Sequence, residues 1–327
     1  MSRPKIYVSR KVSAAVFARL AKAGETRAWE GEGRCPVEVL EREVAEVDAV
    51  IGDDRWTAAL MDRAPRLRII AYTTAGYDAV DVAAATERGI VVTNTPNVLN
   101  DTVADMVVAL MLAVGRRVCE ADRWIRAGEW RTPEAGFLGQ DLHHATLGVL
   151  GLGGIGSAVA RRGRLGFDME VLYNDIVRRE ELERQFGYRF VDLDTLLGES
   201  DFLAISVSLT PLTRGMIGEA QLARMKRSAY LINISRGAVV DEPALIRALQ
   251  EKRIAGAGLD VFEKEPLDQG NPLLRMENVV LLPHIGSATE PTRQAMIDLA
   301  TDNALVVLQG KPPITPVNPE VLSRLKK

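Results

Sequence analysis

The chain of 327 residues is poor in several kinds of residue, and each scarcity excludes a class of protein. Two cysteines, Cys35 and Cys119, are too few for a disulfide framework or a metal cluster. There is no basic block, and the net charge of −3 gives no reason to expect nucleic acid or a membrane surface as a partner. No segment of about 18 residues is apolar without a charged residue in it, so none is expected to span a membrane. The N-terminus lacks the apolar core of a signal peptide. We therefore expect a cytoplasmic protein with reduced thiols and no bound metal.

The chain does contain a regular alternation of strand-like and helix-like segments. Its length favours two domains, and 47% hydrophobic residues can fill their cores. Short runs rich in Ile and Val predict strands, and between them apolar residues recur three or four positions apart, as in amphipathic helices. This alternation predicts parallel sheets covered by helices on both faces. The predicted strands are residues 5–9, 48–51, 67–72, 90–93, 146–151, 169–175, 201–208, 229–235, 255–261 and 278–283.

Three further segments are predicted outside these strands. One long helix is expected from Asp101 to Ala127, too long for an ordinary crossover between strands. A second helix is expected over residues 290–311, and the proline-rich tail after Pro312 should pack against the first part of the chain.

A glycine-rich turn is the best local signal for a cofactor. It lies between a predicted strand and a predicted helix, where glycines allow a tight turn, close approach to a pyrophosphate and close packing of the helix. The free N–H groups of that helix would face the phosphates. The alternative is a glycine turn followed by a chance acid. The residues concerned are Gly151, Gly153, Gly154, Ile155 and Gly156.

Asp175 ends the next predicted strand, nineteen residues after Gly156, where a carboxylate would bind the hydroxyls of an adenosine ribose. Its negative charge would repel a 2′-phosphate, and Ile176 follows it where an NADP enzyme often carries Arg. NAD is therefore the favoured cofactor. NADP remains possible, because Arg178 and Arg179 are near enough in sequence to reach a phosphate.

Three polar residues follow predicted strands and suit hydride transfer to a carbonyl. This chemistry needs a cation for the substrate and an acid for the developing alkoxide, and His284 is the histidine at a strand end. Arg236 and Glu265 follow two other strands, and a carboxylate beside an imidazole would stabilise its protonated form. Alternatively, each is an ordinary surface charge. The remaining histidines, His143 and His144, lie in a polar loop and are expected to be solvated.

The chain resembles the D-isomer-specific 2-hydroxyacid dehydrogenase family over essentially its full length, and most of all the glyoxylate and hydroxypyruvate reductase branch. The most specific segments keep the family's order and spacing at three strand ends. The segments that carry the resemblance are TTAGYDAVD (73–81), VTNTPNVLNDTVAD (92–105), TLGVLGLGGIG (146–156), LINISRGAVVDEPAL (231–245), AGAGLDVFEKEP (255–266) and LLPHIGSAT (281–289).

The resemblance implies a fold and an organisation. The fold class is α/β, with two Rossmann-like or flavodoxin-like, doubly wound parallel-sheet domains and a cleft between them. A discontinuous substrate-binding domain would comprise residues 1–100 and 288–327, and the NAD(P)-binding domain residues 101–287. A homodimer would form through the nucleotide domain and the helix over 101–127.

The resemblance also implies a role for each site residue. His284 would be the acid and base, Glu265 its carboxylate partner, and Arg236 the ligand of the substrate carboxylate and carbonyl. The N–H groups of Ala75 and Gly76 would bind the same carboxylate. The remaining residues would bind the cofactor: Gly154 and Ile155 its pyrophosphate, Asp175 its ribose, and Ile234 and Asp260 its nicotinamide, with Asp260 near the carboxamide.

The resemblance, together with the residues suited to hydride transfer, implies NAD(P)H-dependent reduction of a small 2-keto acid, glyoxylate or hydroxypyruvate, to the (R)-2-hydroxy acid. Some positions depart from the family's pattern: Val103 replaces a Thr near the nicotinamide, and Ala75 stands where phosphite dehydrogenase has Lys, which disfavours phosphite oxidation. An alternative is an NAD(H)-sensing, corepressor-like binding protein of the same fold. Formate dehydrogenation is disfavoured by the residues around His284.

Overall fold

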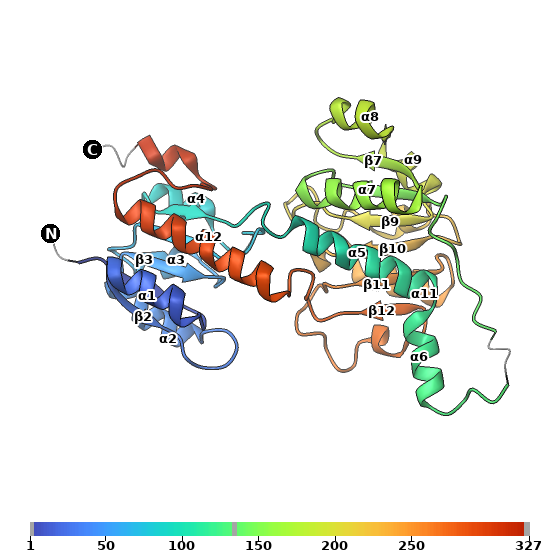
Figure 1. Ribbon diagram of the computed structural model, residues 1–327, viewed down its shortest axis with the longest axis horizontal. Helices are drawn as coiled ribbons and strands as arrows, with labels where there is room; N and C mark the ends of the chain where they lie inside the picture. The colour runs from blue at the N-terminus through green and yellow to red at the C-terminus, as the bar shows by residue number, and fades with distance from the viewer. Residues whose placement is uncertain (1–2, 133–135, 324–327) are drawn as a thin grey trace. The chain divides into compact units, whose positions relative to one another are not determined.

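The computed structural model describes residues 3–132 and 136–323, and the chain divides into two compact units. The first unit comprises Met1–Leu99 and Thr289–Lys327, and the second comprises Asn100–Ala288. Each contains one fully parallel sheet with helices on both faces (Figure 1). The doubly wound α/β fold class predicted from the sequence is confirmed.

The first unit has five strands in the order β2-β1-β3-β4-β5. This is the flavodoxin-like order. β1, β3, β4 and β5 are rich in Ile and Val and almost wholly buried, as expected of parallel strands covered on both faces. The strands are β1 (Lys5–Val8), β2 (Glu25–Ala28), β3 (Ala49–Gly52), β4 (Ile69–Tyr72) and β5 (Val91–Thr93).

Alternate residues of these strands point to two separate apolar clusters. On one face Ile6 and Val8 pack with α1 (Ala14–Ala23) and α12 (Glu290–Leu308). The other face packs against α2 (Val37–Glu43), α3 (Ala58–Asp62) and α4 (Val82–Glu87). The unit therefore needs both terminal segments of the chain to cover its sheet.

The tail after α12 packs against the edge strand of this unit, as predicted. The N–H of Val317 donates to the carbonyl of Val92 at 2.8 Å. The N–H of Val92 donates to Oδ1 of Asn318, also at 2.8 Å. Asn318 is 1% exposed, so this polar residue continues the hydrogen bonding of β5 inside the unit.

The second unit has seven strands in the order β12-β11-β10-β9-β6-β7-β8, and the strand order reverses between β6 and β9. A reversal of this kind is where open α/β sheets bind ligands, at the carboxyl ends of the strands. The strands are β6 (Thr146–Leu150), β7 (Glu170–Asn174), β8 (Arg189–Phe190), β9 (Phe202–Ile205), β10 (Tyr230–Asn233), β11 (Gly256–Leu259) and β12 (Val279–Leu281). The helices between them are α7 (Gly154–Phe167), α8 (Glu180–Phe186), α9 (Leu193–Glu199), α10 (Glu219–Leu222) and α11 (Glu242–Gln250).

The single long helix expected from Asp101 to Ala127 is wrong. The segment forms α5 (Asn100–Gly115) and α6 (Val118–Arg126), and Arg117 between them has a left-handed φ of 54°. The N–H of Gln140 donates to the carbonyl of Gly115 at 2.8 Å and so takes an acceptor that a continuous helix would use. The guanidinium of Arg117 binds both carboxylate oxygens of Glu120, at 2.8 and 2.7 Å, which holds the break in place.

Three short elements, β2, β8 and α3, were not predicted from the sequence. Within the described residues, no helix combines the length and the apolar character needed to cross a bilayer.

Candidate active site

The glycine-rich turn after β6 has the geometry that a dinucleotide pyrophosphate requires. Gly151 has a φ of 93°, a left-handed conformation that side chains rarely tolerate. A Cβ on Gly156 would lie 2.0 Å from the carbonyl oxygen of Gly151, so only glycine lets α7 begin this close to the strand. Gly153, in contrast, faces open space. The turn is therefore tight on its inner side and open toward a ligand, which fits a bound dinucleotide.

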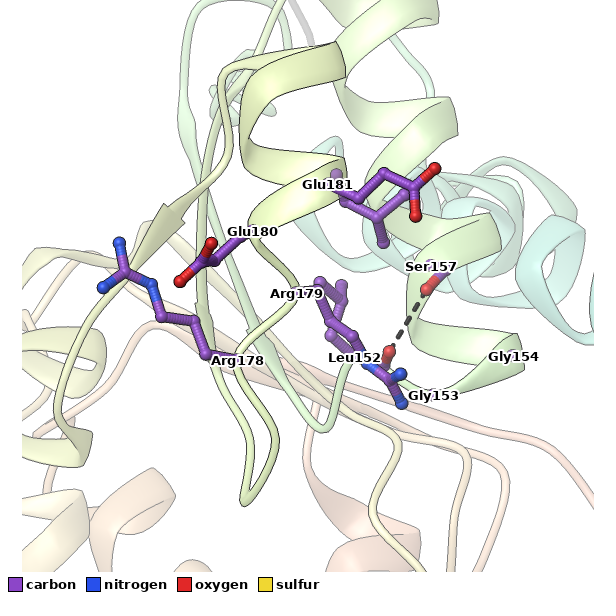
Figure 2. A pocket seen from close by; sticks show the side chains of 9 residues that line it. Leu152, Gly153, Gly154, Ser157, Arg178, Arg179, Glu180 and Glu181 are labelled. Carbon is purple, nitrogen blue, oxygen red and sulfur yellow. Dashed lines mark hydrogen bonds between the residues drawn. The ribbon is translucent and has the colours of Figure 1, made fainter.

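Helix α7 begins directly at this open turn. Its N-cap residue is Gly153, which offers no side chain to the first N–H groups of the helix. These groups and the helix dipole favour an anion. A cavity of about 530 Å³ lies here, between the turn with α7 and the segment that follows β7 (Figure 2). It is lined by Leu152, Gly153, Gly154, Ser157 and residues 178–182.

Asp175 joins the glycine turn to the end of β7. Its Oδ2 accepts the N–H of Leu152 at 2.6 Å, and its Oδ1 accepts the N–H of Val177 at 3.0 Å. A carboxylate has about four lone-pair sites, so two remain for ribose hydroxyls. Ile176 is fully exposed beside it. The acid that the sequence singled out therefore shapes the glycine turn and keeps free acceptor sites.

Three neighbouring strands bring the candidate catalytic residues together. Arg236 follows β10, Glu265 follows β11 and His284 follows β12, and these strands are adjacent in the sheet. Oε2 of Glu265 lies 2.8 Å from Nδ1 of His284. Burial opposes ionisation of Glu265, but the hydrogen bond and charge of His284 outweigh it, so that the pKa of Glu265 is lowered. The pair is thus a carboxylate and an imidazole in direct contact.

Arg236 lies in a turn that two buried polar residues hold. Oδ1 of Asn233 accepts both the N–H and the hydroxyl of Ser235, each at 3.1 Å. Nδ2 of Asn233 donates to the carbonyl of Arg236 at 3.0 Å. Nη1 of Arg236 donates to the carbonyl of Ser235 at 2.9 Å, and the positive charge of Arg236 contributes to the lowered pKa of Glu265.

Gly237 lets this turn meet the segment that carries Glu265. A Cβ on Gly237 would lie 1.8 Å from the carbonyl carbon of Phe262 and 2.0 Å from its oxygen. Oε1 of Glu265 accepts the N–H of that same Phe262 at 3.1 Å. The backbone beside Arg236 is therefore in direct contact with that of Phe262, the residue whose N–H binds Glu265.

Asp260 holds the loop that carries His284. It is 1% exposed, and its two carboxylate oxygens accept the N–H groups of Ile285 and Gly286, each at 2.7 Å. Burial raises the pKa of Asp260, and these two hydrogen bonds oppose the rise. His284 itself has a φ of 55°, which for a residue with a side chain must be maintained by its surroundings. Ile234, 7% exposed, follows β10 beside this site.

Ala75 and Gly76 lie in the other unit, in the loop after β4. Nδ2 of Asn94 donates to the carbonyl of Ala75 at 2.7 Å. The hydroxyl of Thr74 donates to the carbonyl of Gly76 at 2.7 Å. The carbonyl of Thr74 accepts the N–H of Thr95 at 3.0 Å. Since each carbonyl shares a planar peptide unit with the N–H of the next residue, the contacts of Thr74 and Ala75 orient the N–H groups of Ala75 and Gly76.

Sequence reasoning missed the residues that hold the site together. Asn233 and Gly237 lie in the segment LINISRGAVV. The signal that could have indicated them is an amide residue at the end of a buried strand and a glycine directly after Arg236. The structure also brings out Glu183, which binds Arg178 and which no motif indicated. Among residues 3–132 and 136–323, no group of three His, Cys, Asp or Glu side chains is placed to hold a metal ion.

Comparison with known proteins supports the same interpretation. The sequence model of the D-isomer specific 2-hydroxyacid dehydrogenase, NAD binding domain, matches residues 108–286. The glyoxylate reductase of Korarchaeum cryptofilum is 45% identical over 98% of this chain and 97% of its own. The glyoxylate/hydroxypyruvate reductase B of Pectobacterium carotovorum is 50% identical over 85% of this chain and 88% of its own.

A solved structure resembles the whole chain as well. The NADPH-dependent glyoxylate/hydroxypyruvate reductase from Sinorhizobium meliloti, in complex with NADP and malonate, has a TM-score of 0.87 and 38% sequence identity. The match covers 97% of each chain.

Proposed function

This chain belongs to the D-isomer-specific 2-hydroxyacid dehydrogenase family, and we propose that it reduces glyoxylate to glycolate and hydroxypyruvate to (R)-glycerate with NADH. Family membership makes it an NAD(P)-dependent oxidoreductase that acts on a CH–OH group. The contact between Glu265 and His284, at 2.8 Å, is the observation that carries the proposal. The choice of these two keto acids is supported by the names of its relatives. An NAD(H)-sensing binding protein is not favoured, because those relatives are reductases.

His284 would donate the proton in this reaction. Since the pKa of Glu265 is lowered, its carboxylate accepts a hydrogen bond from Nδ1 of His284 and leaves Nε2 for the substrate oxygen. Arg236 would bind the substrate carboxylate and polarise the carbonyl. When bound, NADH supplies the hydride to carbon 2. One keto acid, one NADH and one proton then give one hydroxy acid and one NAD⁺.

The second unit would hold the cofactor through the glycine turn and the nearby strand ends. The pyrophosphate would bind at the start of α7, against the turn formed by Gly151, Gly153, Gly154, Ile155 and Gly156. Asp175 would bind the ribose hydroxyls and disfavour a 2′-phosphate, which is why we propose NADH. Ile234 and Asp260 would border the nicotinamide.

The first unit would be the substrate-binding domain. We propose that the N–H groups of Ala75 and Gly76 bind the substrate carboxylate, a role supported by the fixed loop after β4. Because Ala75 has no charged side chain, the net attraction for the carboxylate would come chiefly from Arg236.

We further propose a homodimer formed through the second unit. Val118 and Ile125 on α6 are about half exposed, and a groove formed by α5 and α7 includes Val108, Leu112 and Leu165. Apolar side chains of this kind suit a surface that another copy of the chain covers. The free thiols of Cys35 and Cys119 suit a reducing compartment, and we propose the cytoplasm.

The direct test is a panel of 2-keto acids, including glyoxylate, hydroxypyruvate and pyruvate, assayed with NADH and separately with NADPH. Oxidation of neither cofactor with any acid would contradict the proposed function. His284→Gln should lower kcat by about 10²–10⁴-fold because the proton donor is lost. His143→Gln is the matched control, since His143 is a solvated histidine of the same unit, and it should retain full activity.

A further inference from the structure

Two adjacent arginines, Arg178 and Arg179, follow β7, and their side chains have different contacts. Nε and Nη2 of Arg178 donate to the two oxygens of Glu183 at 2.9 and 2.8 Å. The hydroxyl of Tyr173 donates to Glu183 at 2.7 Å and accepts the N–H of Arg179 at 2.7 Å. The guanidinium of Arg178 also lies 5.7 Å from the centre of the Phe190 ring. Arg178 is thus held by a bidentate ion pair that a tyrosine and an aromatic ring support.

Both arginines line the cavity beside the glycine turn, but their side chains diverge. Figure 2 shows the guanidinium of Arg178 directed away from the turn, whereas that of Arg179 extends toward Gly153. Glu183 stands on the first turns of α8, and its side chain is only 16% exposed. The difference between two neighbouring arginines is therefore made by one carboxylate.

We propose that Glu183 is a positioning residue that sets the cofactor preference, by holding Arg178 away from the ribose position and so disfavouring NADPH. The inference rests on the proposed dinucleotide site. A 2′-phosphate beside Asp175 needs a compensating cation, and Arg178 is three residues further along the chain. To bind that phosphate, Arg178 must first leave Glu183. The free energy needed to break this ion pair therefore weakens the binding of NADPH.

The ion pair is stronger than a usual surface pair. Isolated exposed pairs contribute little, but bidentate contacts within a network are the exception. The hydrogen bonds from Arg178 and Tyr173 lower the pKa of Glu183 to about 2, so the carboxylate is charged at neutral pH. The restraint on Arg178 is thus constant and does not act as a pH switch.

The test compares binding of 5′-AMP and 2′,5′-ADP by calorimetry, with no keto acid present. Glu183→Gln should tighten 2′,5′-ADP about 10-fold and change 5′-AMP less than about twofold, because only the 2′-phosphate can use the released cation. In turnover, the same variant should lower KM for NADPH and leave kcat unchanged. Equal effects on both nucleotides, or none, would contradict the inference.

Two variants show whether the effect passes through Arg178. The double variant Glu183→Gln, Arg178→Ala should lose the gain for 2′,5′-ADP, and a gain that persists would overturn the assignment. Arg178→Ala alone should leave 2′,5′-ADP binding nearly unchanged, since the native ion pair already withholds this cation. A loss of about 10-fold in that variant would mean that Arg178 binds the phosphate in the native enzyme.

Glu199→Gln is the matched control. Glu199 pairs with Arg189, at the edge of the same sheet and away from the cavity, so both nucleotides should bind as they do to the unchanged protein. Nucleotide binding without reduction of any keto acid would count against the proposed function and leave the inference about Glu183 intact.

Discussion

Glu265 fixes the tautomer of His284. Oε2 of Glu265 is 2.8 Å from Nδ1 of the imidazole, and its other oxygen accepts the N–H of Phe262 at 3.1 Å. Since the pKa of Glu265 is lowered, the carboxylate is an acceptor only, and Nδ1 must carry the hydrogen. Nε2 is then the nitrogen that exchanges its proton.

Glu265→Gln should lower kcat for keto-acid reduction about 10–100-fold, because the neutral amide no longer stabilises the imidazolium. Steady-state rates at saturating keto acid and NADH measure kcat, and a variant that keeps the kcat of the parent would contradict the role of Glu265.

Gly237→Ala should disturb both stability and catalysis. Its Cβ would lie 1.8 Å from the carbonyl carbon of Phe262, so the two backbones must separate, at a cost of about 3 kcal/mol of unfolding free energy. Arg236 and Glu265 would move apart with them, and kcat/KM should fall at least about 10-fold. Gly198→Ala is the control. Gly198 lies in helix α9, and the nearest atom to its added Cβ is 3.9 Å away. That variant should be as stable as the parent or slightly more stable.

Asp260→Asn should loosen the loop that carries His284. Its amide oxygen can accept only one of the N–H groups of Ile285 and Gly286 at the present geometry, while the NH₂ group faces the other donor. We expect kcat to fall by about 10-fold or more through misplacement of His284, with a smaller change in the Kd for NADH. If instead Kd rises and kcat holds, Asp260 acts on the nicotinamide and not on the loop.

Asp54 makes folding of the first unit depend on pH. Burial, aided by the charge of Asp53, raises the pKa of Asp54 to about 6, although Ser9 donates a hydrogen bond to it. A raised folded-state pKa means that protonation favours folding, fully so below about pH 4. This stabilisation is lost as the pH rises through about 6. Asp54→Asn should therefore raise the unfolding free energy at pH 7.5 by about 2 kcal/mol, and much less at pH 4.5.

Urea unfolding at the two pH values measures this difference. Asp62→Asn serves as the control, because Asp62 is largely exposed and pairs with Arg88 at the surface. It should change stability little and equally at both pH values. A pH dependence in Asp54→Asn as steep as that of the parent would contradict the assignment.

Much of the fold was predictable because buried parallel strands have a distinct composition. Runs such as AVIG in β3 and IIAY in β4 are apolar throughout, since helices cover both faces of the sheet. The edge strand β2 has the sequence ETRA and exposes every second residue, so it carries no such signal. The break at Arg117 was harder to predict for another reason: the N–H that takes the Gly115 carbonyl belongs to Gln140, which is distant in sequence.

The same distinction applies to the site. His284, Glu265 and Arg236 were identifiable because each follows a recognisable strand, and parallel strands end at one edge. The contacts that orient them were not, because they depend on which loops meet. Nothing in the sequence indicates that Gly237 touches Phe262, or that Glu183 turns Arg178 aside.

The position of α12 in the chain has a consequence for synthesis. This helix covers one face of the first sheet together with α1, and the segment after it covers one edge, yet both are translated after the second unit. The second unit, residues 100–288, is continuous and complete before they emerge from the ribosome. During translation the nucleotide-binding unit is therefore able to fold first, while one apolar face of strands β1 to β5 is covered only by α1. Until α12 is synthesised, the part of that face it will cover is an exposed apolar surface, which is the kind of surface that aggregates or binds chaperones.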